Sequence, residues 1–390
     1  MTSGGYPRAR DRWGEGFRSS SSEASTRQIR SAGWRRALRR NKVFAAGLLA
    51  LMVPGMVAPE SLWAQETVQW HGYAQIRYGR GDPATGFSLR RGKLWMGGAI
   101  PGVAGLSFKV QGIFRNGSQG AFVLQDLFAE YRVGWGKVEV GQLIPDFSLQ
   151  RSQPDFLVPL VERAQVVETL IPGARTLGRD IGIQMVVAPS AGSPRLALGL
   201  FNGSGANHLA AAEADFLATG RFTLTGDLGP AVRAVLGGSL AWRRVGGLDV
   251  GTLSPTGDAF VGEDFRWGAE ARLAGGRWEV QGEYLRAVLE GEESEGFYLL
   301  GTVALDPANR VALSVERVDT PAKVPAPGPW IIVGGTHVFS EATRPFPQAQ
   351  PSGPAWQGPF PTQLMGDLRV RSVEGELRCG GTLQLQLFFH

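Results

Sequence analysis

Basic side chains are concentrated in one short stretch of the chain, residues 67–120, where they meet a single acid, Asp82. The seven bases are Arg77, Arg80, Arg90, Arg91, Lys93, Lys109 and Arg115. An anion that leaves bulk water loses part of its hydration, and fixed cations can replace what it loses. Guanidinium groups present a flat fork of donors to oxyanions and remain charged at any working pH. This stretch therefore predicts a surface that attracts or guides small anions.

The spacing of these bases indicates β-strands with one apolar and one polar wall. Trp70, Ile76 and Tyr78 have one parity, whereas Gln75 and Arg77 have the other. Side chains alternate across a strand, so residues of one parity share a face. The same reading of the next strands places six bases on the polar wall: Arg77, Arg91, Lys93, Lys109, Arg115 and Arg132.

Alternating segments of about ten residues continue to the end of the chain, which indicates an antiparallel transmembrane β-barrel. Beyond residue 64 there is no apolar run of eighteen residues, and glycine is roughly twice as frequent as in ordinary globular proteins. We expect sixteen strands, an even number as in single-chain bacterial barrels. Their predicted ranges are 70–79, 88–98, 106–115, 123–133, 137–143, 179–187, 195–203, 215–225, 232–243, 265–273, 277–287, 296–304, 309–317, 331–339, 367–377 and 382–389.

In a barrel, the apolar walls would contact lipid and the basic wall would line a water-filled lumen. The reverse arrangement is disfavoured, because Arg or Lys on the lipid face at mid-bilayer costs roughly 2–4 kcal/mol. Two other roles for the arginines stay open. They can neutralise lumen acids such as Asp126, Glu130, Glu139 and Glu270, or they can bind lipid headgroups.

Residues 144–178 form a long irregular segment, in which four prolines exclude a central strand. The segment carries Arg151, Arg163 and Arg175. If it folds into the lumen, these arginines face the strand arginines across the narrowest section. If it folds outward, they are simply solvated.

The predicted connections are short at one end of the barrel and longer at the other, with one exception. The Pro-rich segment 341–366 falls at the short end, while the turn that we place at residues 378–381 falls at the long end. This reversal implies a missed strand or a misplaced final hairpin, which would change the strand count by two.

Residues 35–64 have the order of a secretory signal peptide: five bases up to Lys42, an apolar run at 43–53, and a small residue, Ala64, at the cleavage position. The alternative, a transmembrane helix, needs a longer run to cross roughly 30 Å of hydrocarbon. We expect residues 1–34 to be a polar extension, disordered or not translated, and residues 65–390 to form the barrel. Cleavage would remove 11 of 40 basic and 4 of 35 acidic residues, so the high sequence pI is no argument for nucleic-acid binding.

Several short motifs recur in an order that resembles the phosphate-selective porin O and P family. They are GYAQIRY, FSLRRGKLWMGG, VQGIF, LQDLFAEY, KVEVGQL, the proline-containing loop with VER, GRDIGIQM and LGLFNGSG, spanning residues 72–205. The resemblance implies a trimeric, sixteen-stranded outer-membrane anion channel whose third loop folds into the lumen. It also makes Lys93 and Lys109 the nearest candidates for phosphate-binding lysines. The closing strand, with Phe389 near its end, is typical of barrels handled by the outer-membrane assembly machinery.

No motif points to catalysis, a cofactor or a metal. The four histidines lack metal-ligand spacing, and no serine has a neighbouring His/Asp context that suggests a hydrolase. The lone cysteine, Cys379, excludes an intrachain disulfide. The sequence predicts a passive porin of the bacterial outer membrane for small anions, with phosphate or polyphosphate as candidate solutes. The alternatives are a non-conducting structural or adhesive barrel and, ranked lower, a barrel enzyme.

Overall fold

The computed structural model describes residues 68–81, 85–115, 122–173, 178–188, 193–208, 215–254, 259–321, 328–339 and 362–389. All of these ranges belong to one compact unit, Trp63–His390. The predictions for residues 1–34 and for the signal peptide at 35–64 lie outside the described residues and stay predictions.

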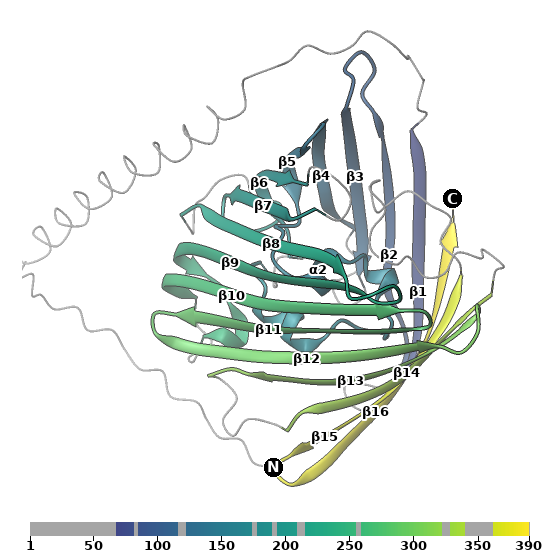
Figure 1. Cartoon of the computed structure of the whole chain (residues 1–390). Coiled ribbons are helices and arrows are strands. Elements are labelled where there is room, and N and C mark those ends of the chain that lie inside the picture. Colours follow the sequence, from purple (N-terminus) through teal and green to yellow (C-terminus); the bar gives the residue numbers. More distant parts are fainter. Residues whose placement is uncertain are drawn as a thin grey trace, which may run out of the picture. The chain divides into compact units, whose positions relative to one another are not determined.

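Sixteen antiparallel strands close into a barrel, as the sequence predicts (Figure 1). The strands are β1 (Gln69–Gly81), β2 (Gly86–Ala99), β3 (Leu106–Arg115), β4 (Phe122–Val133), β5 (Gly136–Leu143), β6 (Asp180–Val187), β7 (Arg195–Phe201), β8 (Leu217–Asp227), β9 (Arg233–Leu248), β10 (Phe260–Gly275), β11 (Trp278–Leu289), β12 (Glu292–Ala304), β13 (Asn309–Asp319), β14 (Trp330–Val338), β15 (Gln363–Val373) and β16 (Glu376–Phe389). Each strand pairs with its sequence neighbours, and β1 closes the ring by pairing with β16.

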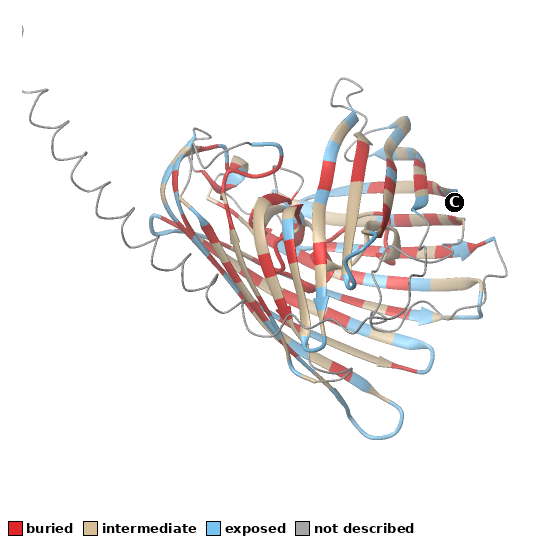
Figure 2. Cartoon of the chain, turned by 90° about the horizontal axis from the view of Figure 1, so that it is seen from above, coloured by how far each residue is buried: buried red, intermediate tan, exposed pale blue. Residues whose placement is uncertain are grey.

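The predicted alternation is visible in the burial of the strands (Figure 2). On β16, Leu383 and Leu387 are exposed, while Gln384 and Gln386 are fully buried inside the barrel. An apolar outer surface and a polar interior are the arrangement of a barrel that stands in a lipid bilayer. Among the described residues, no helix is long and apolar enough to cross a membrane.

Two β-bulges in the first four strands shift the alternation where the sequence shows no break. Between β1 and β2, Gln75 pairs with Arg91 and Ile76 with Leu89, so Arg90 is an extra residue. Between β3 and β4, Gln125 is the extra residue in the same way. At the second bulge the outward face changes parity, because Phe122 and Leu124 are exposed before it and Leu127 is exposed after it. A bulge adds one residue to one strand only, so the faces before and after it exchange parity.

The final hairpin turns at Glu374 and Gly375, and the predicted turn at residues 378–381 is wrong. Both turn residues have positive φ, 53° and 85°, as two-residue hairpins require. The count of sixteen is unaffected. Strand β14 ends and β15 begins at the end of the barrel where β1 begins and β16 finishes, so the predicted place of the long connection, at this otherwise short-turned end, is correct.

The segment between β5 and β6 folds into the barrel, as predicted (Figure 1). It contains the short helices α2 (Leu149–Ser152), η1 (Asp155–Leu157) and α3 (Gln165–Leu170). A further turn, η3 (Gly251–Leu253), lies between β9 and β10. Helix α3 packs on β11, β12 and β13, where Val166, Val167 and Leu170 are completely buried. Burying each such side chain contributes roughly 1.5–3 kcal/mol, so this half of the loop is firmly held.

Candidate functional site

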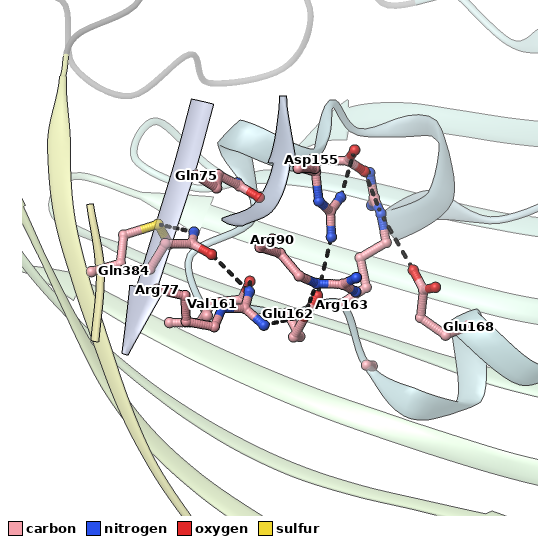
Figure 3. Close-up of polar contacts among 12 residues, drawn as sticks. Gln75, Arg77, Arg90, Asp155, Val161, Glu162, Arg163, Glu168 and Gln384 are labelled. Atoms are coloured by element: carbon pink, nitrogen blue, oxygen red, sulfur yellow. Dashed lines mark hydrogen bonds and ion pairs between the residues drawn. The ribbon is translucent and has the colours of Figure 1, made fainter. Parts of the chain in front are cut away.

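Two carboxylates of the inward loop meet the basic wall of β1 and β2 (Figure 3). Glu162 accepts hydrogen bonds from Arg77 Nη1 and Arg90 Nε, both at 2.7 Å, and from Arg91 Nη2 at 3.3 Å. Asp155 lies within 2.8 Å of Arg91 Nη1 and 2.7 Å of Arg163 Nη2, and it also accepts from Lys93 Nζ. We call these residues the loop–wall cluster: Arg77, Arg90, Arg91, Lys93, Asp155, Glu162 and Arg163. It contains five basic and two acidic groups, a formal surplus of three positive charges.

The strands position the wall side of this cluster through the bulge in β2. Arg91 and Lys93 share a face because they are two residues apart, and the extra residue brings Arg90 to the interior as well. Arg77 lies on the adjacent strand β1, where Gln384 of β16 accepts a second hydrogen bond from its guanidinium at 2.7 Å. Four cations from two paired strands therefore point into the same part of the lumen.

The loop side of the cluster is shaped by Arg163. Its guanidinium donates to the backbone carbonyls of Gln150 and Gln153 as well as to Asp155. These contacts tie the two ends of the segment 150–163 together. Asp155 and Glu162 thereby face the wall from a braced turn instead of from a free loop.

Four aromatic side chains pack together on one side of the cluster. Phe156, next to Asp155, lies 5.7 Å from the ring of Tyr73, 6.3 Å from Trp95 and 5.2 Å from Phe388, measured between ring centroids. The hydroxyl of Tyr73 donates to Asp155 at 3.4 Å. Because these rings exclude water, they lower the local dielectric constant and strengthen the neighbouring ion pairs.

The two loop carboxyls are held ionised by their basic partners. Burial alone would raise the pKa of Glu162, but the positive charges of its three arginines outweigh burial and keep this pKa well below the usual range. Burial also opposes ionisation of Asp155, and its lysine and arginine partners likewise lower the pKa of this carboxyl. Both groups therefore remain carboxylates at neutral pH.

A second set of buried ion pairs lies across the barrel, on β7 to β10. Arg221 contacts Glu270 at 2.6 Å and the loop residue Asp146 at 2.7 Å. Asp264 binds two arginines, Arg243 at 2.8 Å and Arg266 at 2.7 Å. We call this set the anchor network: Asp146, Arg195, Arg221, Arg243, Asp264, Arg266 and Glu270. Its four bases face three acids, so its charges nearly cancel.

Four of the nine residues predicted to lie along an anion path are in the loop–wall cluster: Arg77, Arg91, Lys93 and Arg163. Two others are paired elsewhere on the wall. Lys109 lies 2.8 Å from Asp126, which also binds Arg179 at 2.8 Å, and Arg132 lies 2.6 Å from Glu130, near the barrel end where β1 begins and β16 finishes.

The remaining three predicted residues have different placements. Arg151 is buried in the loop, where its guanidinium packs so closely on Gly178 that a side chain there would collide with it. Arg115 ends β3, opposite Arg91 in the strand register. The structure does not describe the side chain of Arg115, and Arg175 is not among the described residues.

Sequence reasoning counted Arg90 among the bases of this stretch but did not place it on the polar wall, and it did not assign Asp155 or Glu162 to the site. The pair Arg90-Arg91 did carry a signal, because strict alternation would place one of the two arginines in lipid, and a bulge removes that cost. The loop has no periodicity that could mark the two acids, and Glu162 was noted only within the motif VER. Among the described residues, no group of three or more His, Cys, Asp or Glu side chains could hold a metal ion.

No protein-family model and no curated protein sequence matches the chain. Solved structures of similar fold include an anion-selective porin from Comamonas acidovorans, with a TM-score of 0.57 at 15% identity, covering 83% of this chain and 100% of that one. Salmonella typhi OmpF, in a complex with daunomycin, has a TM-score of 0.58 at 10% identity, covering 83% and 98%. A mutant of the Rhodopseudomonas blastica porin has a TM-score of 0.51 at 12% identity, covering 83% and 100%. At these identities the likeness establishes the porin fold.

Proposed function

We propose that this protein is a passive outer-membrane porin for small anions. The observation that carries the proposal is the convergence of five basic groups on only two carboxylates inside the barrel. A surplus of fixed positive charge at a constriction favours anions, because it replaces the hydration that they lose. The fold shared with a porin described as anion-selective supports the same assignment.

The wider setting belongs to the same proposal. An N-terminal signal peptide would export the chain, the assembly machinery would recognise its closing strand, and three copies would associate in the outer membrane. The motif resemblance supports the phosphate-selective porin family and hence phosphate or polyphosphate as solutes. The cluster itself favours anions in general, because its arginines and its lysine would bind any oxyanion.

Reconstitution in planar lipid bilayers tests the channel directly. The folded protein should insert in discrete conductance steps, and under a salt gradient its reversal potential should indicate preference for chloride over potassium. Comparing chloride, phosphate and pyrophosphate as the sole anion then ranks the solutes. A preference for cations would contradict the role proposed for the cluster.

A structural, non-conducting barrel is the second candidate, because the inward loop contacts walls on both sides of the lumen. Besides β1 and β2, it is bonded to Arg221 on β8, Glu283 on β11, Glu316 on β13 and Gln363 on β15. A loop attached on so many sides would obstruct the lumen. Folded protein that inserts into the bilayer without any conductance would favour this candidate.

A further inference from the structure

Glu162 is unusual within the loop–wall cluster because it satisfies three arginines and is still reached by water. Its side chain is 24% exposed, compared with 11% for Asp155 and 5% for Arg163. It contributes a single negative charge to Arg77, Arg90 and Arg91. These three guanidinium groups are therefore covered by a ligand that has access to the solvent.

The loop does not depend on Glu162 for its position. On one side of it, the backbone N–H groups of Leu149 and Gln150 donate to Glu283 at 2.9 and 2.7 Å. On the other side, the N–H of Gln165 donates to Glu316 at 2.9 Å, and helix α3 lies in the apolar core. The Glu162 carboxylate can therefore leave its arginines by rotation about its own side-chain bonds while the loop stays in place.

The arrangement around Glu162 is that of a carboxylate-binding site. Arg77 and Arg90 donate to one carboxylate oxygen, and Arg91 donates to the other. Arg91 also spans the gap to Asp155, so a second carboxylate already lies next to the first. The donors would meet the carboxylate of a separate molecule with the same geometry.

We propose that Glu162 is a displaceable internal ligand, which occupies a binding site for the carboxylates of small organic acids in the lumen. A solute carboxylate takes the place of Glu162 on Arg77, Arg90 and Arg91, and Glu162 returns when the solute leaves. The inference rests on the proposed anion channel and names both a solute class and the residue that competes with it. The three surplus positive charges of the cluster favour dicarboxylates over monocarboxylates.

Binding of succinate to the folded, detergent-solubilised protein tests this inference without any need for conduction. Replacing Glu162→Gln removes the competing charge and keeps the side-chain shape. If Glu162 covers the site nine-tenths of the time, this variant should bind succinate about tenfold more tightly than the unaltered protein, measured by titration calorimetry. Acetate should bind more weakly than succinate to every variant.

Glu168→Gln is the matched control, because Glu168 lies in the same loop and carries the same charge. It lies outside the cluster as defined, is 51% exposed, and reaches the cluster through a 3.9 Å contact with Arg163. This variant should bind succinate as the unaltered protein does. An equal gain in succinate affinity in the two variants would show that the effect comes from removing any negative charge of the loop, and it would overturn the proposal.

Glu162→Asp keeps the test decisive if the glutamine variant does not fold. It retains the charge but is one methylene shorter, so it should compete less well and give an intermediate affinity. Succinate affinity unchanged in the folded variants overturns the inference, even if the protein conducts anions. Tighter binding in a protein that never conducts would support the internal ligand and refute the channel.

Discussion

The loop–wall cluster and the anchor network use the same residue types in the same interior, but they differ in how the charges are shared. In the anchor network, Asp264 serves two arginines, and all three side chains are at most 3% exposed. In the loop–wall cluster, Glu162 serves three arginines, and the side chains of Arg90 and Glu162 are 26% and 24% exposed. A nearly compensated set of ion pairs, in which every side chain except that of Arg195 (31% exposed) is at most 6% exposed, holds structure, whereas an undercompensated, wetter set can attract a mobile anion.

The anchor network also explains how the loop is placed. Arg221 binds the loop carboxylate of Asp146, and Arg266 donates to the backbone carbonyls of Leu170 and Ile171 at 2.8 Å. These contacts hold both ends of the loop against one side of the barrel. The middle of the loop is thereby presented to the basic wall on the other side.

The largest expected effect is on stability, from Asp264→Ala in the anchor network. The change leaves Arg243 and Arg266 buried without their shared carboxylate, which typically costs about 3–5 kcal/mol. Denaturant unfolding in micelles, followed by tryptophan fluorescence, measures the loss. Glu168→Ala, which removes an exposed acid of the loop, serves as the control and should change stability little. Normal stability of the Asp264 variant, combined with altered ion selectivity, would erase the distinction between the two regions.

The next effect is on selectivity, from the double change Arg91→Glu and Lys93→Glu. Each replacement moves the local charge by two, so the cluster passes from a surplus of three positive charges to one negative charge. The reversal potential under a salt gradient should reverse its sign. The double change Arg132→Glu and Lys137→Glu is the charge-matched control, because both side chains pair with Glu130 outside the cluster. A larger shift from the control pair would relocate the anion path.

A smaller change in selectivity is expected for Arg90→Ala. Arg90 is one of three donors to Glu162, and the other two remain. Anion preference should fall without inverting. The free energy of unfolding should change by less than about 1 kcal/mol, because the ion pair between Arg90 and Glu162 is partly exposed. An unchanged reversal potential would show that the bulged arginine braces the loop and does not face the ion path.

The smallest effect is expected for Arg132→Ala. Its side chain is 39% exposed and pairs with Glu130, to which Lys137 also binds. Solvent-exposed ion pairs contribute about 0–1 kcal/mol, so stability and reversal potential should both stay close to those of the unaltered protein. Urea midpoints and bilayer recordings measured side by side are sufficient to check this. A marked loss of anion preference would extend the functional surface toward the barrel end where β1 begins and β16 finishes.

Most of the barrel was predictable, because strand alternation is a local property. The apolar Trp70 and Ile76 have one parity and the basic Arg77 has the other, which indicates the outward and the inward wall of this strand. The same pattern recurs often enough along the chain to count sixteen strands. The bulge at Arg90 was not recognised although the adjacent arginines hint at it, because an extra residue changes no local propensity and its position becomes certain only when two strands are paired. The same reason accounts for the misplaced final turn, where Gly380 and Gly381 resemble a turn but lie in β16 opposite β1.

The sequence by itself determined the closed sheet, its apolar outside and the basic wall of the first strands. Only the tertiary structure decided which acids meet that wall. Glu162 is 85 residues from Arg77 along the chain, and no periodic pattern links the two. Their contact depends on how a loop without regular alternation is anchored on the opposite side of the barrel, and long-range packing of that kind leaves no local pattern in the amino-acid order.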